Sequence, residues 1–356
     1  MDKNIDSLIT YLALNSGSSG GSSEVYEFED FSRFCYGGAR LDYIEKYGTS
    51  KGTNFYEMFT NCNSLVTIPK IDTSNGTNFC RMFYYCTSIT EIPKLDTHNG
   101  TNFGAMFTNC KSLVTIPKID TSNGTNFSSM FYYCNKLSSV PLINTHNGTN
   151  FESMFSNCNS LASIPELDTS NGTNFKNMFS VSGLETLPYL NLSKAQTLAG
   201  MFKNCSSLTQ VGELDTSNVT EFVEMFSYCK KLVTVSKLDL NKVNSSGLVS
   251  NIVQYASELV TLNLYNVRVS ITIGSGSSYG HKLSVDCLVH IIQQLCTAVS
   301  KQTLTIGSVN LNKLVTVWCK VIDDTDEKKP MELCEINDEG AMLIREYAQL
   351  KNWSIK

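Results

Sequence analysis

The chain has 356 residues, of which 42% are hydrophobic and 17% are charged, and Ser, Thr and Asn take the place of the missing charged residues. Its formal net charge is −5, from 28 basic and 33 acidic residues, and no polybasic run occurs. This balance argues against nucleic acid or an anionic membrane as the partner. A chain of this length can bury enough surface to fold without disulfides or metal ions.

The first residues predict a docking segment and a tether. Residues 1–14 can form a short helix whose apolar face comprises Ile5, Leu8, Ile9 and Leu12. Such a helix needs a partner to bury that face, so we interpret residues 1–14 as a docking helix; the alternative is a disordered leader. Residues 15–23 read NSGSSGGSS, the composition of a flexible linker. The apolar run 8–14 is too short to span a bilayer and lacks the basic flank of an export signal.

An aromatic segment, residues 24–54, follows the linker. Its aromatic residues include Tyr26, Phe28, Phe31, Phe34, Tyr36, Tyr43 and Tyr47. We expect this segment to form an N-terminal cap that closes the first open end of the core.

A repeat of 24 residues dominates residues 55–270. A phenylalanine occurs at this spacing six times, and the same residue types follow it each time. These phenylalanines are Phe55, Phe79, Phe103, Phe127, Phe151 and Phe175. Two further repeats contain Met201 and Met225, and a degraded ninth lies around residues 248–267. One repeat cannot bury its own apolar face, so we expect the repeats to stack.

The apolar spacing within a repeat predicts its local structure. In the first repeat, helical spacing relates four residues of one face, namely Phe55, Met58, Phe59 and Cys62. An extended stretch follows, with its apolar residues at Leu65, Ile68 and Ile71. Pro69 lacks a ladder donor and is expected at a strand end, and Gly76 is expected to give the closing turn a positive φ. The predicted fold class is an α/β solenoid of about nine turns of 23–24 residues, with a narrow parallel sheet.

The repeat core NFYEMFTNCNSLVTIPKIDTSN resembles the leucine-rich repeats of the BspA-like branch, found in bacterial and bacteriophage surface proteins. The resemblance covers residues 53–240 and implies a leucine-rich-repeat stack that serves as a scaffold. Residues 271–356 resemble the α/β cap that follows such repeats in phage-associated proteins. Here we expect a helix after Ser284, a strand at Gln302–Ile306 and a helix over residues 339–350. Residues 318–336 depart from the resemblance and are interpreted as an inserted loop or hairpin of unknown role.

Two columns of potential ligands recur in the repeats. One column of thiols comprises Cys62, Cys86, Cys110, Cys134, Cys158, Cys205 and Cys229. We interpret it as buried small side chains, because no His or acidic residue accompanies it as a metal ligand; disulfides or a metal string are the alternative. A column of carboxylates comprises Asp72, Asp96, Asp120, Asp168, Asp215 and Asp239. One carboxylate per turn is too few for Ca²⁺, so we expect these groups to accept hydrogen bonds from turn amides.

No catalytic motif is present, and the sequence predicts neither an enzyme nor a cofactor or metal site. The Asn-Gly-Thr sequons are explained by turn chemistry. One pattern is less easily explained by folding alone, because aromatic and histidine residues alternate with a period of 48 residues. These candidate binding residues are Tyr84, Tyr85, Tyr132, Tyr133, His98 and His146. They form a multivalent contact surface on this hypothesis; the alternative is that they only shield the fold or record a duplication.

The sequence favours a non-enzymatic virion structural or decoration protein, similar to a phage fibre. On this hypothesis residues 1–14 bind other virion proteins, and the solenoid binds a host-surface glycan or protein. The chain is expected on the exposed surface of the particle, made in the host cytoplasm without a signal peptide, and as a homo-oligomer. The alternatives are a bacterial cell-surface adhesin and an intracellular protein-binding scaffold. Host, receptor, head or tail attachment and oligomeric state stay open.

Overall fold

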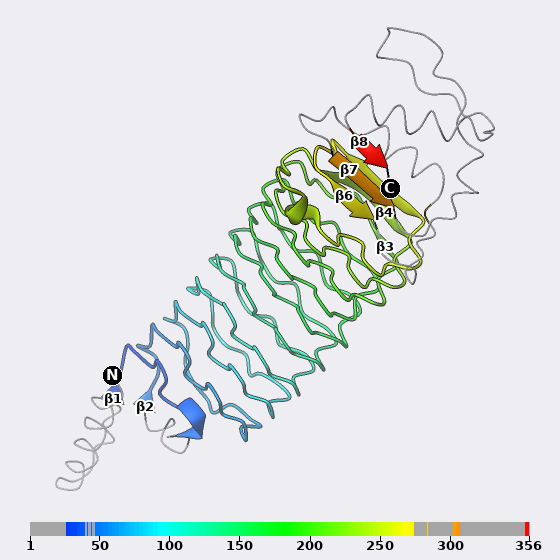
Figure 1. Cartoon of the computed structure of the whole chain (residues 1–356). Coiled ribbons are helices and arrows are strands. Elements are labelled where there is room, and N and C mark those ends of the chain that lie inside the picture. Colours follow the sequence, from blue (N-terminus) through cyan, green and yellow to red (C-terminus); the bar gives the residue numbers. More distant parts are fainter. Residues whose placement is uncertain are drawn as a thin grey trace, which may run out of the picture.

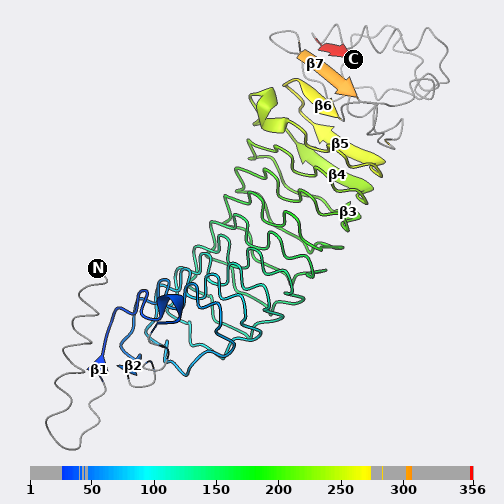
Figure 2. The same cartoon turned by 60° about the horizontal axis from the view of Figure 1, so that its bottom comes forward.

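The computed structural model describes residues 26–39, 41, 44, 47–273, 283, 302–306 and 353–355. Within these residues the chain winds into coils that stack along one axis (Figure 1). Residues 24 apart pair in parallel between neighbouring coils, as Asn54 does with Asn78 and Asn78 with Asn102. A second view shows the same stack from another side (Figure 2). Each coil is named below by its first core residue, for example the Phe55 coil.

The segment from Phe55 to Cys62 is not a helix, so this prediction was wrong. Glu57 and Asn61 lie in the left-handed region, with φ of 54° and 61°, and the equivalent residues of the other coils do the same. The local turns satisfy only every second amide; the amide of Phe59, for example, donates instead to the Met82 carbonyl of the next coil at 2.8 Å. A helix this short would be marginal and would leave terminal amides unpaired. The turns leave no such amides unpaired, because carbonyl groups of the neighbouring coil accept hydrogen bonds from them.

Helices are almost absent from the described residues. The structure contains the 3₁₀ helices η1, Tyr36–Gly38, and η3, Ser246–Val249. The helical half of the predicted α/β solenoid is therefore replaced by hydrogen-bonded turns. In the part of the chain that the structure describes, no helix has the length and apolar character needed to cross a membrane.

Two columns of stacked phenylalanine rings form the centre of the core. The Phe79 and Phe103 rings lie 5.7 Å apart, centroid to centroid, and are nearly parallel. The second column behaves alike, with Phe83 and Phe107 also 5.7 Å apart. Methionine, cysteine and leucine columns fill the remaining interior, and all of them are buried in the Phe103 coil. The neighbouring positions of Phe79 and Phe103 agree with the predicted stacking of successive repeats.

Among the described coils of the repeat region, the predicted parallel sheet forms near the C-terminal end of the stack. Three strands pair in parallel there: β3, Gln210–Val211; β4, Thr234–Asp239; and β5, Thr261–Tyr265. Earlier coils are extended on this side but carry a proline in the middle of it, at Pro69, Pro93, Pro117, Pro141, Pro165 and Pro188. Gly212 stands at the proline position in the coil of β3, and Ser236 stands at that position in the coil of β4. Since proline cannot donate to a ladder, the sheet begins where the prolines end.

The turn that closes each coil also differs from the prediction. Gly76 and its equivalents do not have a positive φ. Glycine is needed there for close packing: a Cβ on Gly124 would lie 2.6 Å from Phe127 Cζ and 3.1 Å from Phe103 Cδ2. The glycine column thus lets two phenylalanine rings approach the backbone.

The described residues of the aromatic segment begin the stack. Phe31 stacks on Phe55 at 5.7 Å, and Phe28 meets Phe31 edge to face at 6.0 Å. The strands β1, Tyr26–Glu27, and β2, Tyr47–Gly48, pair in parallel. This segment therefore forms a coil in register with the repeats, and Phe28 packs on its far side.

A third parallel sheet follows the coils. It comprises β6, Ile271–Ile273; β7, Gln302–Ile306; and β8, Trp353–Ile355. The strand predicted at Gln302–Ile306 is confirmed. The docking helix and linker (1–14 and 15–23), the helices after Ser284 and over 339–350, and the insertion 318–336 lie outside the described residues.

Candidate functional site

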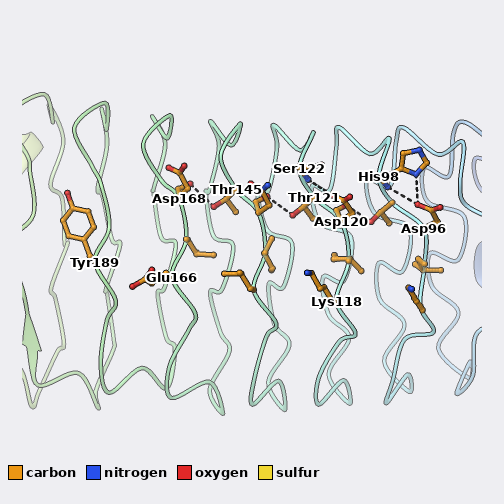
Figure 3. Close-up of a pocket in the computed structure, with 18 residues that line it drawn as sticks. Asp96, His98, Lys118, Asp120, Thr121, Ser122, Thr145, Glu166, Asp168 and Tyr189 are labelled. Atoms are coloured by element: carbon orange, nitrogen blue, oxygen red, sulfur yellow. Dashed lines mark hydrogen bonds and ion pairs between the residues drawn. The ribbon is translucent and has the colours of Figure 1, made fainter.

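An open groove of about 1230 Å³ crosses five consecutive coils on the extended side of the stack (Figure 3). One wall, which we call the outer row, consists of Lys94, Lys118, Leu142, Glu166 and Tyr189. The other wall, the turn row, consists of Asp96, His98, Asp120, Ser122, Asn144 and Asp168. Leu142 is 62% exposed and Tyr189 is 73% exposed, so the outer row presents two large apolar groups to solvent.

The groove follows from alternation along each extended segment. Every residue of the outer row comes directly after a proline of the proline column. The next residue points into the core, as Ile119 and Ile143 do at 2% and 1% exposure. The residue after that, for example Asp120, points outward again and starts the closing turn. Two outward rows flanking a buried column therefore form the walls and floor of one continuous channel.

The aspartates of the turn row hold the closing turns, as the sequence predicts. Asp120 Oδ1 accepts a hydrogen bond from the Ser122 amide at 2.9 Å, and this bond lowers the pKa of the Asp120 carboxyl. Hydrogen bonds from Ser170 and His146 lower the pKa of Asp168 to about 2. These carboxylates are thus ionised and already bonded within the turns. Among the described residues, no group of three His, Cys, Asp or Glu could hold a metal ion.

Buried threonines tie each turn to the next coil. Thr97 Oγ1 donates to the Asp120 carbonyl at 2.6 Å, and Thr121 Oγ1 donates to the Asn144 carbonyl at 2.7 Å. In the opposite direction, Asn123 Nδ2 donates to the His98 carbonyl at 2.8 Å. The asparagine of each sequon is therefore engaged in turn chemistry, as predicted. These bonds fix the turn row relative to its neighbours, so the groove is preformed.

The outer row carries an uneven charge. Lys118 lies toward the N-terminal end of the groove, and Glu166 and Tyr189 lie toward its other end (Figure 3). Lys94 belongs to the coil before that of Lys118, and Leu142 to the coil between those of Lys118 and Glu166. The outer row therefore runs from basic side chains through an apolar one to an acidic one, opposite a turn row that carries Asp96, Asp120 and Asp168. An extended ligand would meet different chemistry at the two ends of the groove, which favours a defined direction of binding.

The tyrosine pairs lie elsewhere in the coil, at the end of the turn segment that begins with phenylalanine. The rings of Tyr84 and Tyr85 are 4.6 Å apart, and those of Tyr132 and Tyr133 are also 4.6 Å apart. We call these four residues the tyrosine edge. The groove lining includes His98 but neither tyrosine pair. His98 contacts Asp96 at 2.7 Å, and His146 contacts Asp168 at 2.9 Å, so both histidines belong to the turns.

The cysteine column is buried and unbridged, as predicted. The described thiols are free. Each thiol of the column donates to a carbonyl of the preceding coil; Cys110 Sγ, for example, lies 3.2 Å from the Phe83 carbonyl. Ser182 stands in this column where the sixth repeat lacks its cysteine, and its Oγ lies 3.4 Å from Cys205 Sγ. Burial raises the pKa of Cys110 to about 12, so this thiol is protonated at neutral pH.

The sequence reasoning missed asparagine pairs that join the starts of neighbouring coils. Asn78 Nδ2 donates to Asn54 Oδ1 at 3.1 Å, and Asn126 Nδ2 donates to Asn102 Oδ1 at the same distance. The same Oδ1 atoms accept an amide two residues on, as Asn102 does from Gly104. The Asn-Phe dipeptide that begins each of the first six repeats was the available signal.

A family model described as "Mycoplasma protein of unknown function, DUF285" matches residues 28–143, 90–189 and 182–270. These ranges together cover more than half of the chain. The chain belongs to the DUF285 family. The DUF285 matches span both the groove and the tyrosine edge, so both surfaces are built on DUF285 coils. No match is found among the curated proteins.

Proposed function

We propose that this DUF285 chain is a non-enzymatic recognition protein, which uses the groove to bind an extended segment of a partner protein. The groove itself carries the proposal: it crosses five coils, its turn row is fixed by bonds between coils, and it exposes Leu142 and Tyr189. Large exposed apolar side chains rimmed by charge are typical of protein interaction sites. Stacked repeats commonly use such extended side faces for binding.

The finer part of the proposal concerns the type of repeat. We propose that the coils are leucine-rich repeats of the BspA-like branch. The motif resemblance supports this, together with coils of about 24 residues, buried leucines such as Leu113 and Leu137, and asparagine pairs between neighbouring coils. This assignment favours adhesion to a host surface as the role of the groove.

Display on a virus particle is the form of adhesion that we propose. The resemblance to phage-associated repeats and the apolar pattern of residues 1–14 support it. Deletion of residues 1–23 tests this idea: the shortened protein should fold but no longer join the particle. Retention of the shortened protein on the particle would contradict docking through residues 1–14, and a particle-free location of the whole chain would favour the cell-surface adhesin.

Bead adhesion tests the groove directly. Beads coated with the full chain are passed over layers of bacterial and epithelial cells, and the retained fraction is counted. The double variant Leu142→Ser, Tyr189→Ser should reduce retention at least fivefold. The matched control is Val66→Ser, Val233→Ser, which removes two apolar side chains that are 54% and 40% exposed and lie outside the groove. Equal retention of the groove variant and the wild type would refute the proposal, as would an equal loss in the control.

A further inference from the structure

The tyrosine edge is built at a backbone position that does not favour tyrosine. Tyr85 and Tyr133 both have a φ of 60°, in the left-handed region. The intervening coils have asparagine there, and Asn61, Asn109 and Asn157 each have a φ of 61°. Asparagine tolerates this conformation far better than a bulky aromatic residue does. The backbone therefore favours asparagine at this position, although Val181, Tyr228 and Tyr255 occupy it in other coils. Tyrosine is thus a recurring choice there that the backbone does not explain.

The tyrosines are placed so that part of each pair faces solvent. Tyr85 is 39% exposed and Tyr133 is 36% exposed, whereas Tyr84 and Tyr132 are half-buried beside them. The Arg81 guanidinium lies 5.4 Å from the centre of the Tyr84 ring and pairs with Glu57 at 3.0 Å. Glu57 also pairs with Arg33 at 2.7 Å, so one carboxylate serves two guanidinium groups. The accessible part of the edge is therefore aromatic, with a partly compensated guanidinium beside its first pair.

Asn109 lies between the two pairs in the same column, and its side-chain amide has no hydrogen-bond partner among the described residues. It is 7% exposed, and within the described residues no hydrogen bond to its side-chain amide is found. By contrast, Asn61 Nδ2 donates to Tyr36 Oη at 2.9 Å and Asn157 Nδ2 donates to Ser156 Oγ at 3.1 Å. In the part of the chain that the structure describes, Ser227 Oγ is the one fully enclosed side-chain polar atom without a partner, so the Asn109 amide remains in reach of the surface.

An open amide between two aromatic platforms matches the chemistry of a sugar. A pyranose ring presents an apolar face of C–H groups and a rim of hydroxyls. The apolar face packs on an aromatic ring, and the hydroxyls exchange hydrogen bonds with an amide, which both donates and accepts. The platforms recur in every second coil, about 10 Å apart at the usual spacing of parallel strands. Such repetition suits a chain of sugars better than a single ring.

We propose that the tyrosine edge is a binding site for a neutral oligosaccharide, with Tyr85 and Tyr133 as stacking platforms and Asn109 as the hydrogen-bonding group between them. The proposal rests on the proposed recognition function and adds a second site, apart from the groove, with its own ligand chemistry. The groove takes protein and the tyrosine edge takes sugar.

Calorimetric titration of the full chain with cellohexaose, maltohexaose and chitohexaose tests the site. At least one of these probes should bind. One variant gives the Phe79 and Phe127 coils the residues of the Phe55 and Phe103 coils: Tyr84→Thr, Tyr85→Asn, Tyr132→Thr, Tyr133→Asn. This variant should weaken binding at least tenfold. Its melting temperature should be unchanged or higher, because asparagine suits the left-handed backbone. Failure of all three probes to bind the wild type overturns the proposal, as does affinity within twofold of wild type in the variant.

A pair of single variants separates the role of Asn109 from general effects on the fold. Asn109→Ala should weaken binding at least fivefold, and Asn157→Ala, the same change at a paired amide, should leave it within twofold. Equal effects of the two changes contradict the assigned role of Asn109. The groove variant Leu142→Ser, Tyr189→Ser should bind the oligosaccharide normally. Loss of bead retention in that variant, with no sugar binding by the wild type, would refute the sugar site and leave the groove proposal intact.

Discussion

Val181 occupies the least suitable backbone position for its residue type in the stack. Its φ is 59°, and its amide donates to the Lys203 carbonyl at 2.7 Å, which fixes the left-handed conformation. A β-branched residue is strongly disfavoured there. The variant Val181→Asn, which introduces the residue of Asn157 and Asn204, should raise the free energy of unfolding by about 1 kcal/mol, measured in urea. The reverse change, Asn157→Val, should lower it by a similar amount. A stabilising Asn157→Val would contradict this account.

The cysteine column should make the free energy of unfolding fall as the pH rises above 9. Burial raises the pKa of Cys110 to about 12 and that of Cys205 to about 11, above their usual value of 9.0. The stabilising contribution is therefore complete below pH 9 and is lost as the pH rises toward the folded-state pKa, because only the unfolded chain releases the proton. Each such thiol lowers the free energy of unfolding by about 1.4 kcal/mol per pH unit above 9.

Comparison of the wild type with the Cys110→Ser variant separates the contribution of the Cys110 thiol from that of Lys and Tyr side chains, which also titrate at alkaline pH. A serine can donate to the same carbonyl but does not titrate, so the decline in unfolding free energy between pH 9 and 11 should be less steep by about 1.4 kcal/mol per unit. Urea titrations at pH 8, 9, 10 and 11 measure the slopes. Identical slopes for the two proteins would show that the thiol is not buried.

At the scale of one coil, the sequence predicted the buried columns but not the backbone that carries them. Phe55, Met58 and Phe59 fall at helical spacing, yet consecutive turns with left-handed residues place the same side chains inward. The periodicity of side chains cannot separate these alternatives. The turns are favoured over a helix because every second amide donates a hydrogen bond to a carbonyl of the neighbouring coil, and this bonding exists only in the stack. The proline column, in contrast, was visible in the sequence and marks the coils that lack ladder strands.

The contact between glycine and phenylalanine should be the least tolerant feature of a coil. Gly124→Ala places a methyl group against Phe127 and Phe103, and overpacking of this kind should cost about 2 kcal/mol. One coil shows a natural solution: Leu198 replaces the phenylalanine, and the buried Ala195 stands at the glycine position three residues before it.

The double variant Gly124→Ala, Phe127→Leu copies that arrangement. It should be more stable than the sum of the two single changes predicts, with a favourable interaction energy of about 1 kcal/mol in a double-mutant cycle. Urea denaturation of the four proteins gives the cycle. Strict additivity would mean that the alanine methyl group is accommodated without contact with the Phe127 ring.

At the scale of the whole molecule, the 24-residue spacing was enough to predict that repeats stack, whereas the groove was not predicted. The tyrosines and histidines were predicted as binding residues because they alternate in the sequence, but His98 and His146 contact the aspartates of the closing turns. The groove depends on the residue after each proline, which changes along the stack from lysine through leucine to glutamate and tyrosine. A variable position within an otherwise constant repeat was the usable signal. It gains meaning only when alternation shows that this position faces outward.

A stack held together by contacts between neighbours should survive the removal of whole coils. Deletion of residues 103–150 removes 48 residues and joins Asn102 to Phe151, which restores the Asn-Phe dipeptide and the register of every column. The shortened chain should unfold in one transition, with a denaturant dependence lower by about one seventh, because less surface becomes exposed. It should also lose bead retention, since Leu142 and the middle of the groove are gone. An unfolded product would show that distant coils depend on one another, and full retention would place the recognition surface outside the groove.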